Sequence, residues 1–143
     1  MLGEDHPDTL TSATNLALDL AGLGDYRQAH DLDFDILTRR RRVLGEDHPD
    51  TLTSASNLAN DLRMLGEHQP ARILHEDTLS RRRRTLGPDH PDTIDSAHDL
   101  AADLRSLGDH QQARNLDEDT LSRRRRLQCG DHPYTLRTAH SRP

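Results

Sequence analysis

The chain has 143 residues, a formal net charge of −6 and 19 basic residues, all of which are arginine. This acidic balance argues against a surface devoted to nucleic acid, although local basic patches remain compatible with it. The sequence has no apolar run of about 18 residues and no charged amino terminus followed by an apolar stretch. We therefore expect a cytoplasmic protein without a membrane span or a secretory signal.

One nine-residue stretch, Leu44 to Leu52, recurs along the chain and divides it into units. It is identical at Leu2 to Leu10, nearly identical at Leu86 to Ile94 and degraded at Gln128 to Leu136. Its histidine recurs every 42 residues, a period typical of stacked repeat proteins. We predict a single array over residues 1–143, with units 1–42, 43–84 and 85–126 and a partial unit 127–143.

Each unit reads as two amphipathic helices. In the first unit, Leu10, Ala13, Leu16, Ala17, Leu20 and Leu23 recur at helical spacing, which predicts a helix from Pro7 to about Gly22. A second helical pattern, from Asp25 to Leu44, includes Ala29, Ile36, Leu37 and Val43. Only two or three residues connect the helices, so they pack as an antiparallel hairpin.

The second and third units repeat this layout, and Pro70 falls in a first helical turn, where proline is tolerated. The predicted fold is all-α: a right-handed helical solenoid of antiparallel helix hairpins, with three repeats and a partial fourth. No polar capping helix is readable at either end. We therefore expect either a fragment of a longer array or self-association through the uncapped ends.

The residues at the hairpin turns resemble those of the tetratricopeptide repeat family. The pattern is Gly24-x-Tyr26-x-x-Ala29, then Gly66-x-His68-x-x-Ala71 and Gly108-x-His110-x-x-Ala113. The 42-residue unit and its junction Gly45-Glu46-Asp47-His48-Pro49-Asp50 are similar to the kinesin light chain type of repeat. Such arrays also occur in actinobacterial multidomain proteins. The resemblance implies a solenoid that binds protein partners; His68 and His110, in place of an aromatic ring, depart from its pattern.

The repeated Asp-His-Pro-Asp motif raises the question of a metal site. Packed helices lie about 10 Å apart, whereas zinc ligands lie about 2 Å from the ion. One histidine per loop is therefore too sparse, and we expect no metal and no cofactor; His48 and Asp47 instead end one helix and begin the next. No phosphate loop, activated nucleophile or carboxylate pair on a shaped pocket is readable, so we do not expect an enzyme.

Arginine quartets at residues 39–42, 81–84 and 123–126 form the strongest charge feature. Structurally, they suit the negative end of a helix dipole, and their first members lie four residues after Asp35, Asp77 and Asp119. Functionally, a row of such quartets could bind nucleic acid or an acidic protein. Nucleic acid is the less favoured ligand, because no aromatic residues alternate with the arginines.

The first helix of each unit has a polar face opposite its apolar one. In stacked hairpins these faces line the concave side, and an asparagine can hold an extended peptide backbone. Asn15-Leu16-Ala17 and Asn57-Leu58-Ala59 match the asparagine that lies on this surface in kinesin light chain repeats. The predicted peptide-binding groove comprises Thr11, Asn15, Leu18, Thr53, Asn57, Asn60, Arg63, Met64, Asp95, Asp99 and Arg105. Ordinary solvated helix positions remain an alternative interpretation.

The leading hypothesis is a noncatalytic protein-protein interaction module that binds a partner peptide in this groove. Two alternatives stay open. One is electrostatic binding of nucleic acid or acidic protein by the arginine quartets, and the other is a structural spacer within a larger signalling protein.

Overall fold

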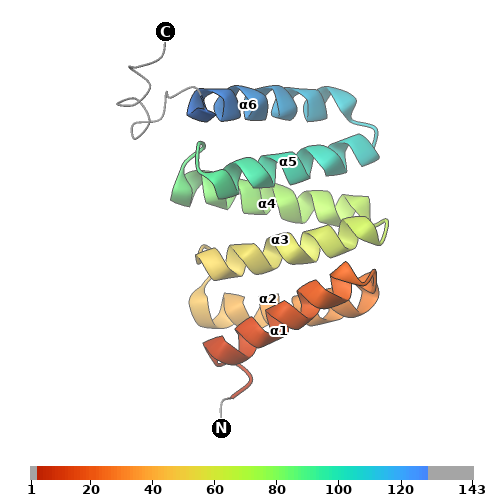
Figure 1. Ribbon diagram of the computed structural model, residues 1–143, viewed down its shortest axis with the longest axis vertical. Coiled ribbons are helices and arrows are strands. Elements are labelled where there is room, and N and C mark those ends of the chain that lie inside the picture. The colour runs from red at the N-terminus through yellow and green to blue at the C-terminus, as the bar shows by residue number, and fades with distance from the viewer. Residues whose placement is uncertain (1–2, 129–143) are drawn as a thin grey trace.

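The computed structural model describes residues 3–128, which form six α-helices and no strand. The helices are stacked in chain order from one end of the molecule to the other (Figure 1). Each helix packs against the next one in the chain, and α3 also contacts α5. Their bounds are α1 Pro7–Gly22, α2 Tyr26–Leu44, α3 Pro49–Met64, α4 His68–Leu86, α5 Pro91–Ser106 and α6 His110–Gln128. The predicted helical solenoid is confirmed, while most of the predicted partial unit lies outside the described residues.

A histidine caps the first helix of each repeat. The backbone N–H groups of Asp8, Asp50 and Asp92 donate to the Nδ1 atoms of His6, His48 and His90 at 3.1, 3.1 and 3.0 Å. A proline follows each histidine at the start of the helix, where it has no hydrogen bond to lose. The prediction that these histidines belong to the helix junction is confirmed, and their role is to accept one of the free N–H groups.

A glycine reverses the chain between the two helices of each hairpin. Gly24 has a φ of 84°, and its N–H donates to Ala21 O at 2.9 Å while Asp25 N donates to Leu20 O at 2.8 Å. This is the hydrogen-bond pair that commonly ends an α-helix at a left-handed residue. Gly66 and Gly108 repeat it, with φ values of 85° and 87°. The tight turn places consecutive helices side by side in antiparallel directions.

Two clusters of the apolar core are each built around the first helix of a repeat. Around α3 lie Leu37, Ala55, Leu58, Leu62 and Ala71, and around α5 lie Leu79, Ala97, Leu100, Ala101, Leu104 and Ala113. The alanines let neighbouring helices approach closely. Each cluster therefore joins the second helix of one repeat to both helices of the next.

The first helix has one uncovered face. Leu16 is 53% exposed, whereas Leu58, which occupies the same position one repeat later, is 5% exposed. No described helix precedes α1, so Leu16 and Leu23 stay exposed despite the apolar pattern that placed them in the core. Val43, also on a predicted apolar face, is exposed in the last turn of α2.

Candidate functional site

The predicted groove residues lie along α1, α3 and α5. All eleven are exposed or partly buried, and they follow one helix per repeat. The exposed ones are Thr11, Asn15, Leu18, Thr53, Met64, Asp95 and Arg105, and the partly buried ones are Asn57, Asn60, Arg63 and Asp99.

A hollow of about 190 Å³ brings four of these residues together between the first and second repeats. Leu18, Asn57, Asn60 and Met64 line it. The hollow is also lined by Ala17 and Ala21 of α1, Tyr26 and Asp33 of α2, and Asp61 of α3. It therefore lies where three helices meet.

Two buried carboxyl groups, Asp33 and Asp61, lie at this hollow, with exposures of 3% and 4%. Burial raises the pKa of Asp61 to about 8, and the hydrogen bond with Asp33 and its negative charge act in the same direction. Burial also raises the pKa of Asp33, although the hydrogen bond from Asp61 and the positive field of His30 oppose it. The two acids can bond to each other only while one of them holds a proton.

Two buried oxygen atoms at the hollow lack an N–H or hydroxyl donor. Within residues 3–128, no such group reaches Asn60 Oδ1 or Asp61 Oδ2, and the Asp61 carboxyl is hydrogen-bonded only to the carboxyl of Asp33. A buried acceptor without a donor loses its hydration and gains nothing in return. These atoms mark the hollow as a place where a donor from outside the chain would be stabilised.

The junction between the second and third repeats places a base beside its buried acid, although Asp103 Oδ1 and His75 Nε2 also lack a hydrogen-bond partner among the described residues. There His75 of α4 is completely buried, and its Nδ1 is hydrogen-bonded to the completely buried carboxylate of Asp103. Arg63 Nη1 lies 3.9 Å from carboxylate oxygens of both Asp99 and Asp103. Burial raises the pKa of Asp99, while the charges of His75 and Arg63 lower it. The carboxylates here face basic groups supplied by the chain itself.

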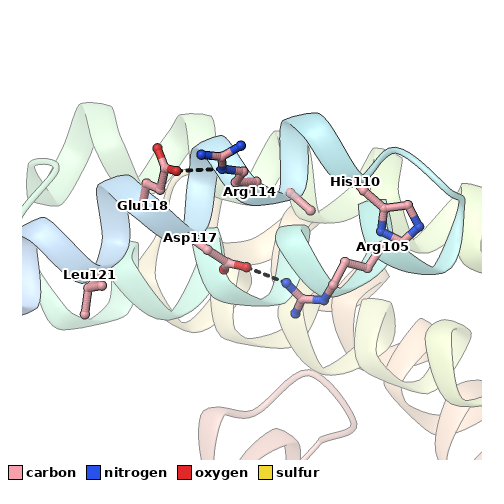
Figure 2. A pocket seen from close by; sticks show the side chains of 7 residues that line it. Arg105, His110, Arg114, Asp117, Glu118 and Leu121 are labelled. Carbon is pink, nitrogen blue, oxygen red and sulfur yellow. Dashed lines mark hydrogen bonds and ion pairs between the residues drawn. The ribbon is translucent and has the colours of Figure 1, made fainter.

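In the last hairpin, the equivalent arginine pairs with a carboxylate of its own repeat. Arg105, one repeat after Arg63, is paired with Asp117 of α6, and Arg114 is paired with Glu118 (Figure 2). These residues line a hollow of about 310 Å³ together with His110, Ala113 and Leu121. Arg105 therefore turns toward its own hairpin, because no described helix presents the counterparts of Asp99 and Asp103 to it.

The arginine quartets are largely engaged by the protein. In the second repeat, Arg81 and Arg84 donate to Asp47 at 2.8 and 2.9 Å, and their guanidinium groups lower the pKa of that carboxyl. Arg82 is buried and donates to Ser96 Oγ, 2.8 Å away on the next repeat. The first repeat has the same contacts, with Arg39 and Arg42 on Asp5 and Arg40 on Ser54.

The predicted pairs of Arg39, Arg81 and Arg123 with the aspartate four residues earlier are confirmed at 2.9, 2.9 and 2.8 Å. Arg123 and Arg126 also pair with Asp89. The third arginine of each quartet is exposed and outside these contacts to the preceding junction, and in the last quartet Arg124 is also exposed and pairs with Asp95 of α5. The quartets therefore tie junctions and neighbouring repeats together more than they present an open basic surface.

Two kinds of feature are missing from the part of the chain that the structure describes. Residues 3–128 contain no group of three or more histidine, cysteine, aspartate or glutamate side chains placed to hold a metal ion. None of the described helices combines the length and apolar character needed to cross a membrane.

The buried Asp33, Asp61, His75 and Asp103 were missed in the sequence analysis. The sequence does carry a signal for them, because an aspartate recurs at positions 19, 61 and 103 and an acid or histidine at 33, 75 and 117. Each set has the 42-residue period and interrupts an otherwise apolar helix face. A polar residue at the same interior position of successive repeats indicates a contact between repeats.

Comparison with protein families supports the repeat architecture. The family model described as Tetratricopeptide repeat matches residues 9–50, 51–92 and 93–134. Comparison with curated protein sequences finds no match.

Solved structures show the same fold. The chain is 28% identical to the nearly identical TPR-like repeats of a Podosopora anserina protein named as a candidate kinesin light chain, with a TM-score of 0.80. That match covers 95% of this chain and 64% of the other, so the chain spans less than two thirds of its length.

Two more distant structures share the fold alone. BtubC (BKLC) from P. vanneervenii is 22% identical, with a TM-score of 0.79, and the match covers 91% of this chain and 52% of that one. The TPR domain of Arabidopsis FLU is 17% identical, with a TM-score of 0.70 and coverage of 80% and 92%. Three family matches over most of the chain, on a stack of helix hairpins, establish that this chain belongs to the tetratricopeptide repeat family.

Proposed function

We propose that the face formed by α1, α3 and α5 binds an extended segment of a partner protein, and that the chain acts as a noncatalytic interaction module. The observation that carries this proposal is the hollow between the first two repeats. It combines apolar walls, such as Leu18 and Met64, with a buried amide oxygen, Asn60 Oδ1, that has no donor in the described chain. Apolar walls with a few placed polar groups are typical of ligand sites.

The family adds support, because tetratricopeptide repeats in general serve as scaffolds for protein partners. Asn57, which matches the surface asparagine of kinesin light chain repeats, lines the same hollow. An asparagine can accept from a peptide N–H and donate to a peptide C=O at once. Such a contact would hold a backbone without specifying its side chains.

Another surface competes with this assignment. A hollow of about 540 Å³ lies between α2 and α4 and is lined by Arg41, Gln69, Pro70, Ile73, Leu74 and Asp77. It is larger, but none of its lining residues holds a buried polar atom that lacks a partner in the described chain. We favour the smaller hollow because unsatisfied polar atoms, more than volume, indicate a missing partner group.

Electrostatic binding by the arginine quartets is the less supported function. Most of their guanidinium groups already face carboxylates of the preceding junction or a serine of the next repeat. A nucleic-acid backbone would have to displace these contacts.

The test is binding of a peptide array, or of peptides selected from a random displayed library, by three forms of the chain. The wild type is compared with Asn57→Ala, on α3, and with Ile73→Ala, an exposed position on α4 in the competing hollow. We expect Asn57→Ala to lower the affinity for the bound peptides by about tenfold, which corresponds to the loss of one or two hydrogen bonds. Ile73→Ala should leave the affinity unchanged. The opposite ranking would move the site to α2 and α4, equal binding by all three forms would show that neither hollow is the site, and failure to select any peptide would favour a spacer.

A further inference from the structure

The two junctions between described repeats differ in the charged residues that occupy equivalent positions. At the second junction, Arg63 reaches from α3 toward α5, where its Nη1 atom lies 3.9 Å from carboxylate oxygens of Asp99 and Asp103. The same atom also donates to the backbone oxygen of Asp99 at 3.4 Å. The Arg63 side chain is only 22% exposed. An arginine of this chain thus lies over the acidic surface of the next repeat.

At the first junction, the arginine is absent. Ala21, 42 residues before Arg63, occupies the equivalent position on α1, and the positions of Asp99 and Asp103 are held by Asn57 and Asp61. The space that a longer side chain at position 21 would occupy belongs to the hollow, which Ala21, Asn57 and Asp61 all line. The hollow is therefore a version of the Arg63 site from which the basic side chain has been removed.

Among the described residues, no arginine pairs with Asp33 or Asp61, and the charge of His30 lowers only the pKa of Asp33. His75, which bonds to Asp103 at the second junction, is replaced at the first by a further acid, Asp33. Asp33 and Asp61 are both buried, and no N–H or hydroxyl group of the described residues reaches Asp61 Oδ2. Buried carboxylates are stabilised by a guanidinium or ammonium group that donates hydrogen bonds to them.

We propose that the hollow between the first two repeats takes an arginine or lysine side chain of the bound partner peptide, with its charged end toward Asp61 and Asp33. This deepens the proposed function and rests on it. The amide oxygens of Asn57 and Asn60 offer further acceptors, and Leu18, Tyr26 and Met64 offer apolar contact to the alkyl stem. The hollow of about 190 Å³ has room for a side chain, since a cavity that holds one water needs only about 10 to 15 Å³ by the same measure.

A bare metal ion fits this place less well than a basic side chain. Only two carboxylates meet there, and residues 3–128 hold no group of three or more ligands of the usual metal-binding types. An apolar side chain also fits less well, because it would leave the buried oxygens of Asn60 and Asp61 without donors and without water. A guanidinium or ammonium group supplies hydrogen-bond donors to these oxygens and a positive charge beside the two acids.

The test uses the whole chain and peptides selected from a random 12-residue displayed library. Each selected peptide that contains arginine is resynthesised with citrulline, which keeps the shape of the side chain and removes its charge. Affinities are measured by fluorescence anisotropy for the wild type, Asp61→Asn and Ala21→Arg. The Ala21→Arg variant supplies from α1 the group that Arg63 supplies at the next junction, and Ala21→Gln is its uncharged control.

We expect enrichment of arginine or lysine at one peptide position, and a loss of about tenfold or more on change to citrulline, as for a charged hydrogen bond. Ala21→Arg should weaken binding at least as much, while Ala21→Gln retains more of it. Asp61→Asn should remove the preference for arginine over citrulline. Circular dichroism shows that each variant is folded.

Two results would overturn the inference. In the first, peptide binding depends on Asn57, but the peptides show no preference for arginine or lysine and Asp61→Asn leaves their affinity unchanged. The pocket for a basic side chain would then be contradicted, while the peptide groove would be supported. In the second, substitutions at Asn57 and Ala21 leave the affinity of every peptide unchanged. Both the groove and the pocket within it would then be contradicted.

Discussion

The substitution Asp61→Asn tests whether a buried acid pair is present between the first two repeats. In the folded chain the pKa of Asp61 is raised to about 8, whereas an aspartic acid in an unfolded chain has a pKa of about 3.9. Between these values the folded state holds a proton that the unfolded state has released. The free energy of unfolding contributed by this group therefore falls as the pH rises, and asparagine removes this dependence.

The size of the effect follows from one proton. Its steepest slope is about 1.4 kcal/mol per pH unit. Between pH 6 and pH 8 the wild type should therefore lose up to about 2 to 3 kcal/mol relative to Asp61→Asn. Because a neutral amide replaces a protonated acid of similar shape, the two proteins should have similar stability near pH 6.

Urea unfolding followed by circular dichroism at pH 6, 7 and 8 measures this difference. The matched control is Asp103→Asn, at the same position one repeat later, where the carboxylate is bonded to His75 and lies near Arg63. Removing one partner of this buried hydrogen bond should destabilise the chain by about 1 to 3 kcal/mol. A difference between wild type and Asp61→Asn that stays constant from pH 6 to pH 8 would refute the buried acid pair.

Four further substitutions test how the repeats are built. His48→Ala removes the cap of α3 and should lower the free energy of unfolding by about 1 kcal/mol; no loss in thermal unfolding would argue against the cap. Gly66→Ala places a side chain at a φ of 85° and should cost roughly 1 to 2 kcal/mol, measured in urea. Leu58→Ala should cost about 3 kcal/mol and Leu16→Ala much less, because only Leu58 is buried; equal losses would contradict the uncovered face of α1.

The helix boundaries could be predicted from the sequence because local residues determine them. Pro49 begins a helix and Gly66 permits the left-handed turn after it, so the period and the hairpin follow without knowledge of distant contacts. Exposure of Leu16 could not be read from its own helix, since it depends on whether another helix packs on that face.

Polar contacts between repeats were harder to predict. Arg82 lies within a run of four identical residues, and only the rotation of α4 against α5 distinguishes it as the one that reaches Ser96. The groove face was located from helical periodicity, but the acids beneath it were not, because Asp33 and Asp61 lie on different helices of different repeats. Helical periodicity within one helix shows which face is buried; it does not show which residue of a neighbouring repeat meets that face.

The central claim, a peptide site on the face of α1, α3 and α5, is tested most directly by nuclear magnetic resonance. Backbone amide shifts of the labelled chain are followed as a selected arginine-containing peptide is added, with its citrulline form as the control. We expect shift changes centred on Leu18, Asn57, Asn60 and Met64 that shrink strongly with citrulline. Changes centred on Ile73 and the outer side of α4, or on residues 81–84, would contradict it.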